Sequence, residues 1–201
     1  MDTIDSVEEV KEYLKRLEAG AQIAVAGIQY EDATVCPGLA TSVFLQGCDI
    51  RCPGCFNKET WGCHGAGQWH QNTLLAAIQA SPIVRTVCWL GGEPTLQCEN
   101  LRQTVGMLAH HRYTQILFTG RTKEEILKRC VPCSSFEWLI GSMNYVKAGP
   151  YIEKLKDPKL KYRGSSNQRI YKVSVEDKEL HRGVSLEDVT DTWENITYDL
   201  I

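Results

Sequence analysis

No apolar run in the 201-residue chain approaches the roughly 20 residues that a helix needs to cross a bilayer. The first residues, Met1 to Asp5, show neither the basic stretch nor the apolar stretch of a secretory signal. From these two absences we expect no membrane association and no export, and we predict a cytoplasmic protein.

The chain also lacks a concentrated basic segment. Its net charge is -3, and the stretch from Glu176 to Ile201 holds eight acidic and two basic residues, so the remainder is only mildly basic. Nucleic-acid binding needs Lys and Arg clustered on one face, and we therefore expect no nucleic-acid partner. No Ser/His/Asp set and no paired carboxylate site stands out, so the common hydrolytic arrangements are not indicated.

Cysteine, by contrast, is abundant. The chain has nine, an odd number, in a sequence that is 43% hydrophobic and 23% charged. The composition predicts one globular domain with a proper core. Without an export signal, so many cysteines indicate reduced thiols and metal ligation rather than disulfides.

Three of these thiols have the spacing C-x3-C-x2-C, at Cys48, Cys52 and Cys55. They follow the apolar run Ser42–Gln46, which has strand composition and ends at Gly47. Three close thiolates in a loop suit an iron–sulfur cubane, and they leave one of its four irons open to an exchangeable ligand. The alternative is a zinc knuckle completed by Cys63 or His64.

The longer string Cys52–Trp61, with Pro-Gly between its two cysteines and Asn-Lys-x-Thr-Trp after them, resembles a known family. It is similar to the radical S-adenosylmethionine (SAM) proteins, and among them to the activating proteins of anaerobic (class III) ribonucleotide reductase. Gly91-Gly92-Glu93-Pro94 and Arg163–Gln168 resemble two further motifs of the same proteins. The resemblance covers roughly residues 21 to 175.

The resemblance implies a [4Fe-4S] cluster on Cys48, Cys52 and Cys55, with SAM bound at its open iron. It implies that SAM contacts Gly54, Cys55, Phe56, Gly91, Gly92, Glu93 and Thr119. The chain departs from the family pattern at three positions: Cys36 stands where the family has Gly, Arg121 where it has Tyr, and Ala148 where Asp is common.

Strand and helix patterns alternate through most of the chain, which predicts an α/β fold with a largely parallel sheet. From the resemblance we expect a compact, partial (open) radical SAM β/α barrel with mostly parallel strands. We expect a leading helix in residues 1–20, the radical SAM domain in 21–175 and an acidic C-terminal extension in 176–201.

Several local predictions are open to a direct check. Ser6–Glu18 has a capping box and helical apolar spacing. The segment Trp61–Gln71 is predicted to be loop, and Phe136–Val146 to supply a strand. Cys130 and Cys133 are predicted to be reduced thiols at a helix end. In the tail, Val189, Trp193, Ile196 and Leu200 share a helical face, although the many Thr residues weaken that helix.

The resemblance implies an activating enzyme that cleaves SAM reductively and generates a glycyl radical on anaerobic ribonucleotide reductase. A low-potential electron donor such as a flavodoxin is then required. Two alternatives remain open: a compact radical SAM enzyme acting on another glycyl-radical enzyme or on a peptide, and a non-enzymatic zinc-binding module.

Overall fold

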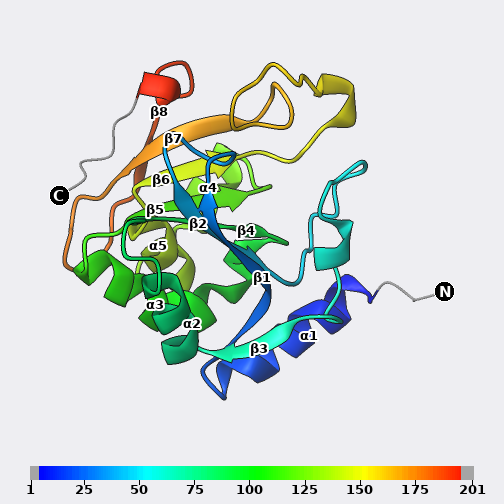
Figure 1. The fold of residues 1–201 in the computed structure, drawn as a ribbon, viewed down its shortest axis with the longest axis vertical. Coiled ribbons are helices and arrows are strands. Elements are labelled where there is room, and N and C mark those ends of the chain that lie inside the picture. The colour runs from blue at the N-terminus through cyan, green and yellow to red at the C-terminus, as the bar shows by residue number, and fades with distance from the viewer. Residues whose placement is uncertain (1–4, 196–201) are drawn as a thin grey trace.

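The computed structural model describes residues 5–195. Its centre is one eight-stranded sheet with the strand order β3-β1-β2-β4-β5-β6-β7-β8 (Figure 1). The strands are β1 (Gln22–Asp32), β2 (Ala40–Leu45), β3 (Gly67–His70), β4 (Thr86–Gly91), β5 (Thr114–Thr119), β6 (Tyr145–Ala148), β7 (Arg169–Ser174) and β8 (Ser185–Asp188).

The predicted α/β fold with an open sheet is confirmed. The four central strands, β2, β4, β5 and β6, run parallel to one another, whereas the pairings of β1, β3, β7 and β8 at the two flanks are antiparallel. In a parallel sheet, the carboxyl ends of neighbouring strands meet at one edge, where ligands bind in open α/β folds. The loops after β2, β4, β5 and β6 therefore gather at that edge.

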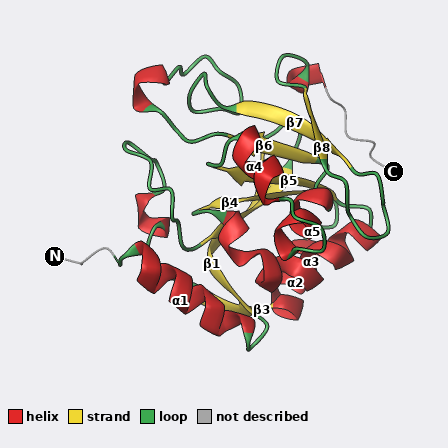
Figure 2. Ribbon diagram, turned by 180° about the vertical axis from the view of Figure 1, so that it is seen from behind, coloured by secondary structure: helices red, strands yellow, loops and turns green. Residues whose placement is uncertain are grey.

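Four helices lie on one face of the sheet, as Figure 2 shows from behind. They are α2 (Gln71–Gln79), α3 (Cys98–His110), α4 (Lys123–Arg129) and α5 (Ser135–Gly141). Each strand points alternate side chains to this face. The large core between sheet and helices includes Val43, Trp89, Leu101, Leu117 and Ile140, all fully buried.

The opposite face of the central strands has a smaller core, formed with the segment after β1 and with the 3-10 helix Trp193–Asn195. Cys36, Cys88, Ile116 and Trp193 are buried there. None of the described helices is long and apolar enough to cross a membrane.

The leading helix is confirmed as α1 (Val7–Glu18). Ser6 and Glu9 form the predicted capping box, with each side chain bonded to the other residue's backbone N–H. Val10, Leu14 and Leu17 are buried in a third core cluster, together with Ala24 of β1.

Two local predictions are wrong. Part of Trp61–Gln71, expected to be loop, forms the short edge strand β3 paired with β1. The first half of Phe136–Val146, expected to be strand, forms α5, and only Tyr145 onward joins the sheet. The Ser134 side chain accepts a hydrogen bond from the Glu137 N–H at the start of α5, a capping signal that the sequence does contain.

Part of the acidic C-terminal segment belongs to the sheet, because β8 pairs with β7. The tail helix expected from Val189 onward is absent from the described residues, which hold a strand and a single 3-10 turn in this region. Ile196 and Leu200, the other two positions of that face, lie outside the described residues.

Candidate metal and cofactor site

The cysteine loop leaves the carboxyl end of β2 and is held firmly at its base. Gly47 has a φ of +94°, and a Cβ there would lie 2.9 Å from Val10 and 3.0 Å from Leu14 of α1. The Gly47 and Cys48 N–H groups donate to the carbonyls of Thr60 and Trp61, at 2.8 and 3.1 Å. The start of the loop is thus packed between α1 and the end of the string Cys52–Trp61.

Backbone N–H groups lie near all three sulfurs of the C-x3-C-x2-C motif, and the one at Cys55 makes a hydrogen bond. The Ile50 and Arg51 amides face the Cys48 sulfur, and the Tyr151 amide faces that of Cys52. The Asn57 N–H donates to the Cys55 sulfur at 3.4 Å. Backbone donors directed at sulfur stabilise thiolates and tune iron–sulfur clusters.

Burial has the opposite effect on two of the thiols. It raises the pKa of Cys48 to about 11, and it also raises the pKa of Cys52. In the metal-free protein these groups therefore hold their protons at neutral pH. Iron binding releases the protons, because the ligand is the thiolate.

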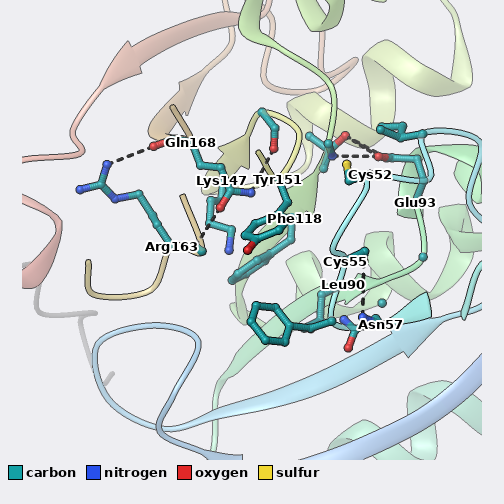
Figure 3. A pocket seen from close by; sticks show the side chains of 18 of the residues that line it. Cys52, Cys55, Asn57, Leu90, Glu93, Phe118, Lys147, Tyr151, Arg163 and Gln168 are labelled. Carbon is teal, nitrogen blue, oxygen red and sulfur yellow. Dashed lines mark hydrogen bonds between the residues drawn. The ribbon is translucent and has the colours of Figure 1, made fainter. Parts of the chain in front are cut away.

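The three cysteines open onto one cavity of about 430 Å³, a size typical of small-molecule sites. Figure 3 shows Cys52, Cys55 and Glu93 on one side of it, Arg163 and Gln168 on the other, and Lys147, Phe118 and Tyr151 between them. The donor set and the adjoining space fit an iron–sulfur cluster with a second ligand beside it.

The zinc alternative finds no support at this site. Among residues 5–195, no three His, Cys, Asp or Glu side chains converge on a position where they could share one metal ion. The two candidate fourth ligands are directed elsewhere: His64 Nε2 lies 3.0 Å from the Asp5 carboxylate, and the Cys63 thiol donates to the Glu9 carbonyl at 3.8 Å. Cubane ligands each bind a different iron and are spread around the cluster, so they do not form such a single-ion group.

The turn after β4 is joined directly to the cysteine loop. The Gly92 N–H donates to the Leu45 carbonyl and the Glu93 N–H to the Gly47 carbonyl, both at 2.8 Å. A Cβ on Gly91 would lie 2.6 Å from Leu45 backbone, and one on Gly92 would lie 2.3 Å from the Gly47 carbonyl oxygen. Because Gly91 and Gly92 have no side chain, the end of β4 can approach the base of the cysteine loop. The sequence alone did not predict this role of the two glycines.

Glu93 is buried, and its carboxylate joins the ends of two strands. It accepts hydrogen bonds from the Thr95 N–H and hydroxyl, from the Thr119 hydroxyl and from the Gly120 N–H, at 2.7 to 3.1 Å. Four donors occupy most of the acceptor capacity of a carboxylate. Glu93 therefore fastens the turn after β4 to the end of β5, in addition to facing the cavity.

Arg121, where the family pattern has Tyr, forms a buried ion pair with the cysteine loop. One of its terminal nitrogens lies 3.0 Å from both oxygens of Asp49, which directly follows Cys48. Its Nε donates to the Thr95 hydroxyl at 2.8 Å. Sequence reasoning missed this role, since Arg121 and Asp49 are 72 positions apart and neither shows a pattern.

Six of the seven residues predicted to contact SAM line the cavity. They are Cys55, Phe56, Gly91, Gly92, Glu93 and Thr119. Gly54 does not line it: a Cβ there would face Glu153 and Tyr151 instead. Phe56 lies at the rim with 71% of its surface exposed and contacts the edge of the Tyr151 ring.

The string Arg163–Gln168 folds back on the loop after β6. Asn167 donates to the Pro150 carbonyl at 2.8 Å, and Gln168 donates to that of Gly149 at 3.1 Å. Arg163 donates to the Gln168 carbonyl at 3.1 Å. The string thus satisfies its own backbone and that of the loop after β6, and also lines the cavity through Arg163, Gly164 and Gln168.

The second cysteine pair lies away from this site. Cys130 caps the carboxyl end of α4, as predicted, and Cys133 is exposed in the following turn. Neither residue lines the cavity. No disulfide joins any of the nine cysteines, all of which lie within the described residues.

Comparison with known proteins shows what the chain is similar to. The chain is 28% identical over 148 residues to the anaerobic ribonucleoside-triphosphate reductase-activating protein of Vibrio cholerae, covering 69% of this chain and 91% of that protein. It is 37% identical over 70 residues to the pyruvate formate-lyase-activating enzyme of Clostridium pasteurianum, covering 32% of this chain and 29% of that enzyme. Superposition on the crystal structure of QueE from Escherichia coli gives a TM-score of 0.49 at 20% identity, covering 70% of this chain and 64% of QueE.

The family described as "4Fe-4S single cluster domain" matches residues 35–171, which contain the cysteine loop, the turn after β4 and the end of β5. This match covers more than half of the sequence. The chain therefore belongs to the 4Fe-4S single cluster domain family.

Proposed function

We propose that this protein is a radical SAM activating enzyme that generates a glycyl radical on an anaerobic ribonucleotide reductase. The observation that carries the proposal is the cysteine loop. Its three sulfurs have backbone N–H groups beside them, and they share one cavity with Glu93 and the turn after β4. Three ligands for four irons leave one iron open to SAM.

The choice of protein substrate follows from the relatives. The reductase-activating protein of Vibrio cholerae is matched over 91% of its length, whereas the pyruvate formate-lyase-activating enzyme is matched over only 29%. The string Arg163–Gln168, which resembles a motif of the reductase activators, also lines the cavity through Arg163, Gly164 and Gln168. We therefore favour the reductase over another glycyl-radical enzyme or a peptide.

The chain itself supplies ligands, positioning and a shielded space. Cys48, Cys52 and Cys55 would hold the cluster, which supplies one electron for the reductive cleavage of SAM. Glu93 and Arg121 hold the strand ends and the cysteine loop in one arrangement. Aromatic side chains, Phe118, Tyr151 and Tyr162, form part of the wall and limit the access of water.

Glycine is a suitable target on physical grounds. Without a Cβ it can bring its α-carbon close to a bound cofactor, and the radical that remains is delocalised over the adjacent amide groups. A low-potential electron donor such as a flavodoxin completes the proposal.

The test is anaerobic mixing of the iron-reconstituted protein with SAM, dithionite and the anaerobic ribonucleotide reductase of the same organism. We expect an EPR doublet, because the unpaired electron couples to the one remaining α-hydrogen. A reductase with alanine in place of its radical glycine is the matched control. SAM cleavage without a doublet on the reductase would favour the peptide-modifying alternative, and a colourless protein holding zinc would favour the zinc-binding module.

A further inference from the structure

Two cationic side chains, Lys147 and Arg163, line the cavity, and neither forms an ion pair with any of residues 5–195. Lys147 lies on β6, where Val146 and Ala148 point into the core beneath the helices and Lys147 points to the opposite face, into the cavity (Figure 3). Its ammonium donates one hydrogen bond, to the Tyr162 carbonyl at 3.1 Å. It also lies 4.2 Å from the centre of the Phe118 ring.

The surroundings of Lys147 do not neutralise its charge. In the described part of the chain, no carboxylate lies within ion-pairing distance of it. Among the described residues, Glu93 is the one acidic residue that lines the cavity; Thr95, Thr119 and Gly120 take up most of its acceptor capacity, and it forms no ion pair with Lys147. An ammonium has three donors, and among residues 5–195 only one of those on Lys147 has an acceptor.

The local field favours an anion at this point. The pKa of Lys147 is lowered to about 8, chiefly by burial, while Cys88 raises it and the positive charge of Arg163 lowers it. Cys88 is itself a fully buried thiol whose pKa is raised well above the ordinary value, so it carries no charge at neutral pH. A partly desolvated cation beside a second cation is costly unless a ligand supplies the missing negative charge.

We propose that Lys147 binds the carboxylate of SAM. The inference rests on the proposed function, which places SAM in this cavity. SAM carries a positive sulfonium, a positive or metal-bound amino group and a single carboxylate, so the carboxylate is its one anionic group. Phe118 and Tyr162 then hold the lysine in place, and the lysine orients the amino-acid part of SAM.

The first experiment measures the equilibrium affinity of SAM for the cluster-reconstituted protein under anaerobic conditions. Lys147→Met keeps the apolar stem and removes the charge, whereas Lys147→Arg keeps the charge. We expect roughly a ten- to hundredfold weaker SAM affinity for Lys147→Met, because a charge-assisted hydrogen bond is lost. Lys147→Arg should retain most of the affinity.

The second experiment uses decarboxylated SAM as the probe. The native protein and Lys147→Met should bind it with the same affinity, because the group that Lys147 recognises is missing from the ligand. Iron content, measured on each variant, shows whether the cluster site itself is intact. A merely structural role of Lys147 would weaken the binding of both ligands equally and would overturn the proposal.

Proton uptake provides an independent readout. Near pH 8.5 a free Lys147 with a pKa of about 8 is largely neutral, and a bound carboxylate raises that pKa, so binding takes up protons. Calorimetry of SAM binding in two buffers of different ionisation enthalpy should show this uptake in the native protein and not in Lys147→Arg. Equal SAM affinity and equal proton uptake in all three proteins would refute the role of Lys147, whether or not a glycyl radical forms on the reductase.

Discussion

The buried ion pair between Arg121 and Asp49 allows a quantitative test of how the cysteine loop is held. The side chains are only 6% and 12% exposed, and one guanidinium nitrogen lies 3.0 Å from both carboxylate oxygens. Arg121→Met removes the cation and keeps much of the apolar stem. Asp49 is then left as a nearly buried carboxylate without a charged partner.

The expected cost follows from the exposure of the two groups. Breaking a buried pair by removing one partner typically costs about 3–5 kcal/mol in the free energy of unfolding. With a urea dependence of about 2 kcal/mol per molar, the midpoint of unfolding should fall by roughly 1.5–2.5 M. A single domain has about 5–15 kcal/mol of stability, so most of the variant should remain folded.

The assay is urea unfolding of the metal-free protein with its thiols kept reduced, followed by iron analysis after anaerobic reconstitution. Arg169→Met is the matched control, since the Arg169–Asp188 pair has a similar separation of 2.9 Å but side chains that are 41% and 37% exposed. Such a surface pair is worth at most about 1 kcal/mol. We expect Arg121→Met to bind less iron than the native protein and Arg169→Met to bind the same amount.

A second variant keeps the reasoning testable if Arg121→Met unfolds. Replacing both partners, as in Arg121→Met with Asp49→Leu, removes the unpaired charge and should recover a large part of the lost stability. If Arg121→Met costs no more than Arg169→Met, or if the double variant is less stable than the single one, the ion pair does not hold the loop.

Three further predictions concern the rest of the site. Replacing Cys48, Cys52 or Cys55 by Ala should remove most bound iron, whereas the double variant Cys130→Ala with Cys133→Ala should keep nearly all of it. Loss of iron from this double variant would refute the ligand set Cys48, Cys52 and Cys55. Glu93→Ala should lower SAM affinity roughly ten- to a hundredfold at unchanged iron content, because one charge-assisted hydrogen bond is lost. It should also lower the urea midpoint, because Thr95 and Thr119 lose their acceptor. An unchanged SAM affinity at equilibrium would contradict this role of Glu93. Gly92→Ala should reduce both stability and iron content, because its Cβ would lie 2.3 Å from a backbone oxygen. Gly106→Ala in α3 is the control: its Cβ has room, and the change should raise the free energy of unfolding by roughly 0.5–1 kcal/mol. Equal urea midpoints for these two variants would show that the close approach at Gly92 is not needed.

Short-range patterns in the sequence account for the features that were predicted correctly. The capping box at Ser6 and the strand before Gly47 each depend on residues within a few positions of one another. Backbone geometry converts such patterns directly into local structure, so they are readable without knowing the fold.

The incorrect predictions have different causes. Gly67–His70 becomes a strand only because β1 lies beside it, and its own residues carry little strand signal. The apolar residues of α5 were read as strand, although Ser134 and Glu137 have the spacing of a helix start. The first error needed the tertiary structure, whereas the second could have been avoided from the sequence.

The sequence by itself determined the cluster motif, the alternation of strands and helices, and the family, because these depend on residue type and local spacing. Only the tertiary structure placed Arg121 against Asp49 and Lys147 in the cavity. The physical reason is that parallel strands bring their carboxyl ends together at one edge, so residues from β2, β4, β5 and β6 meet there although they are far apart in the chain. Which charges find partners at that edge is decided by this packing, and no local pattern records it.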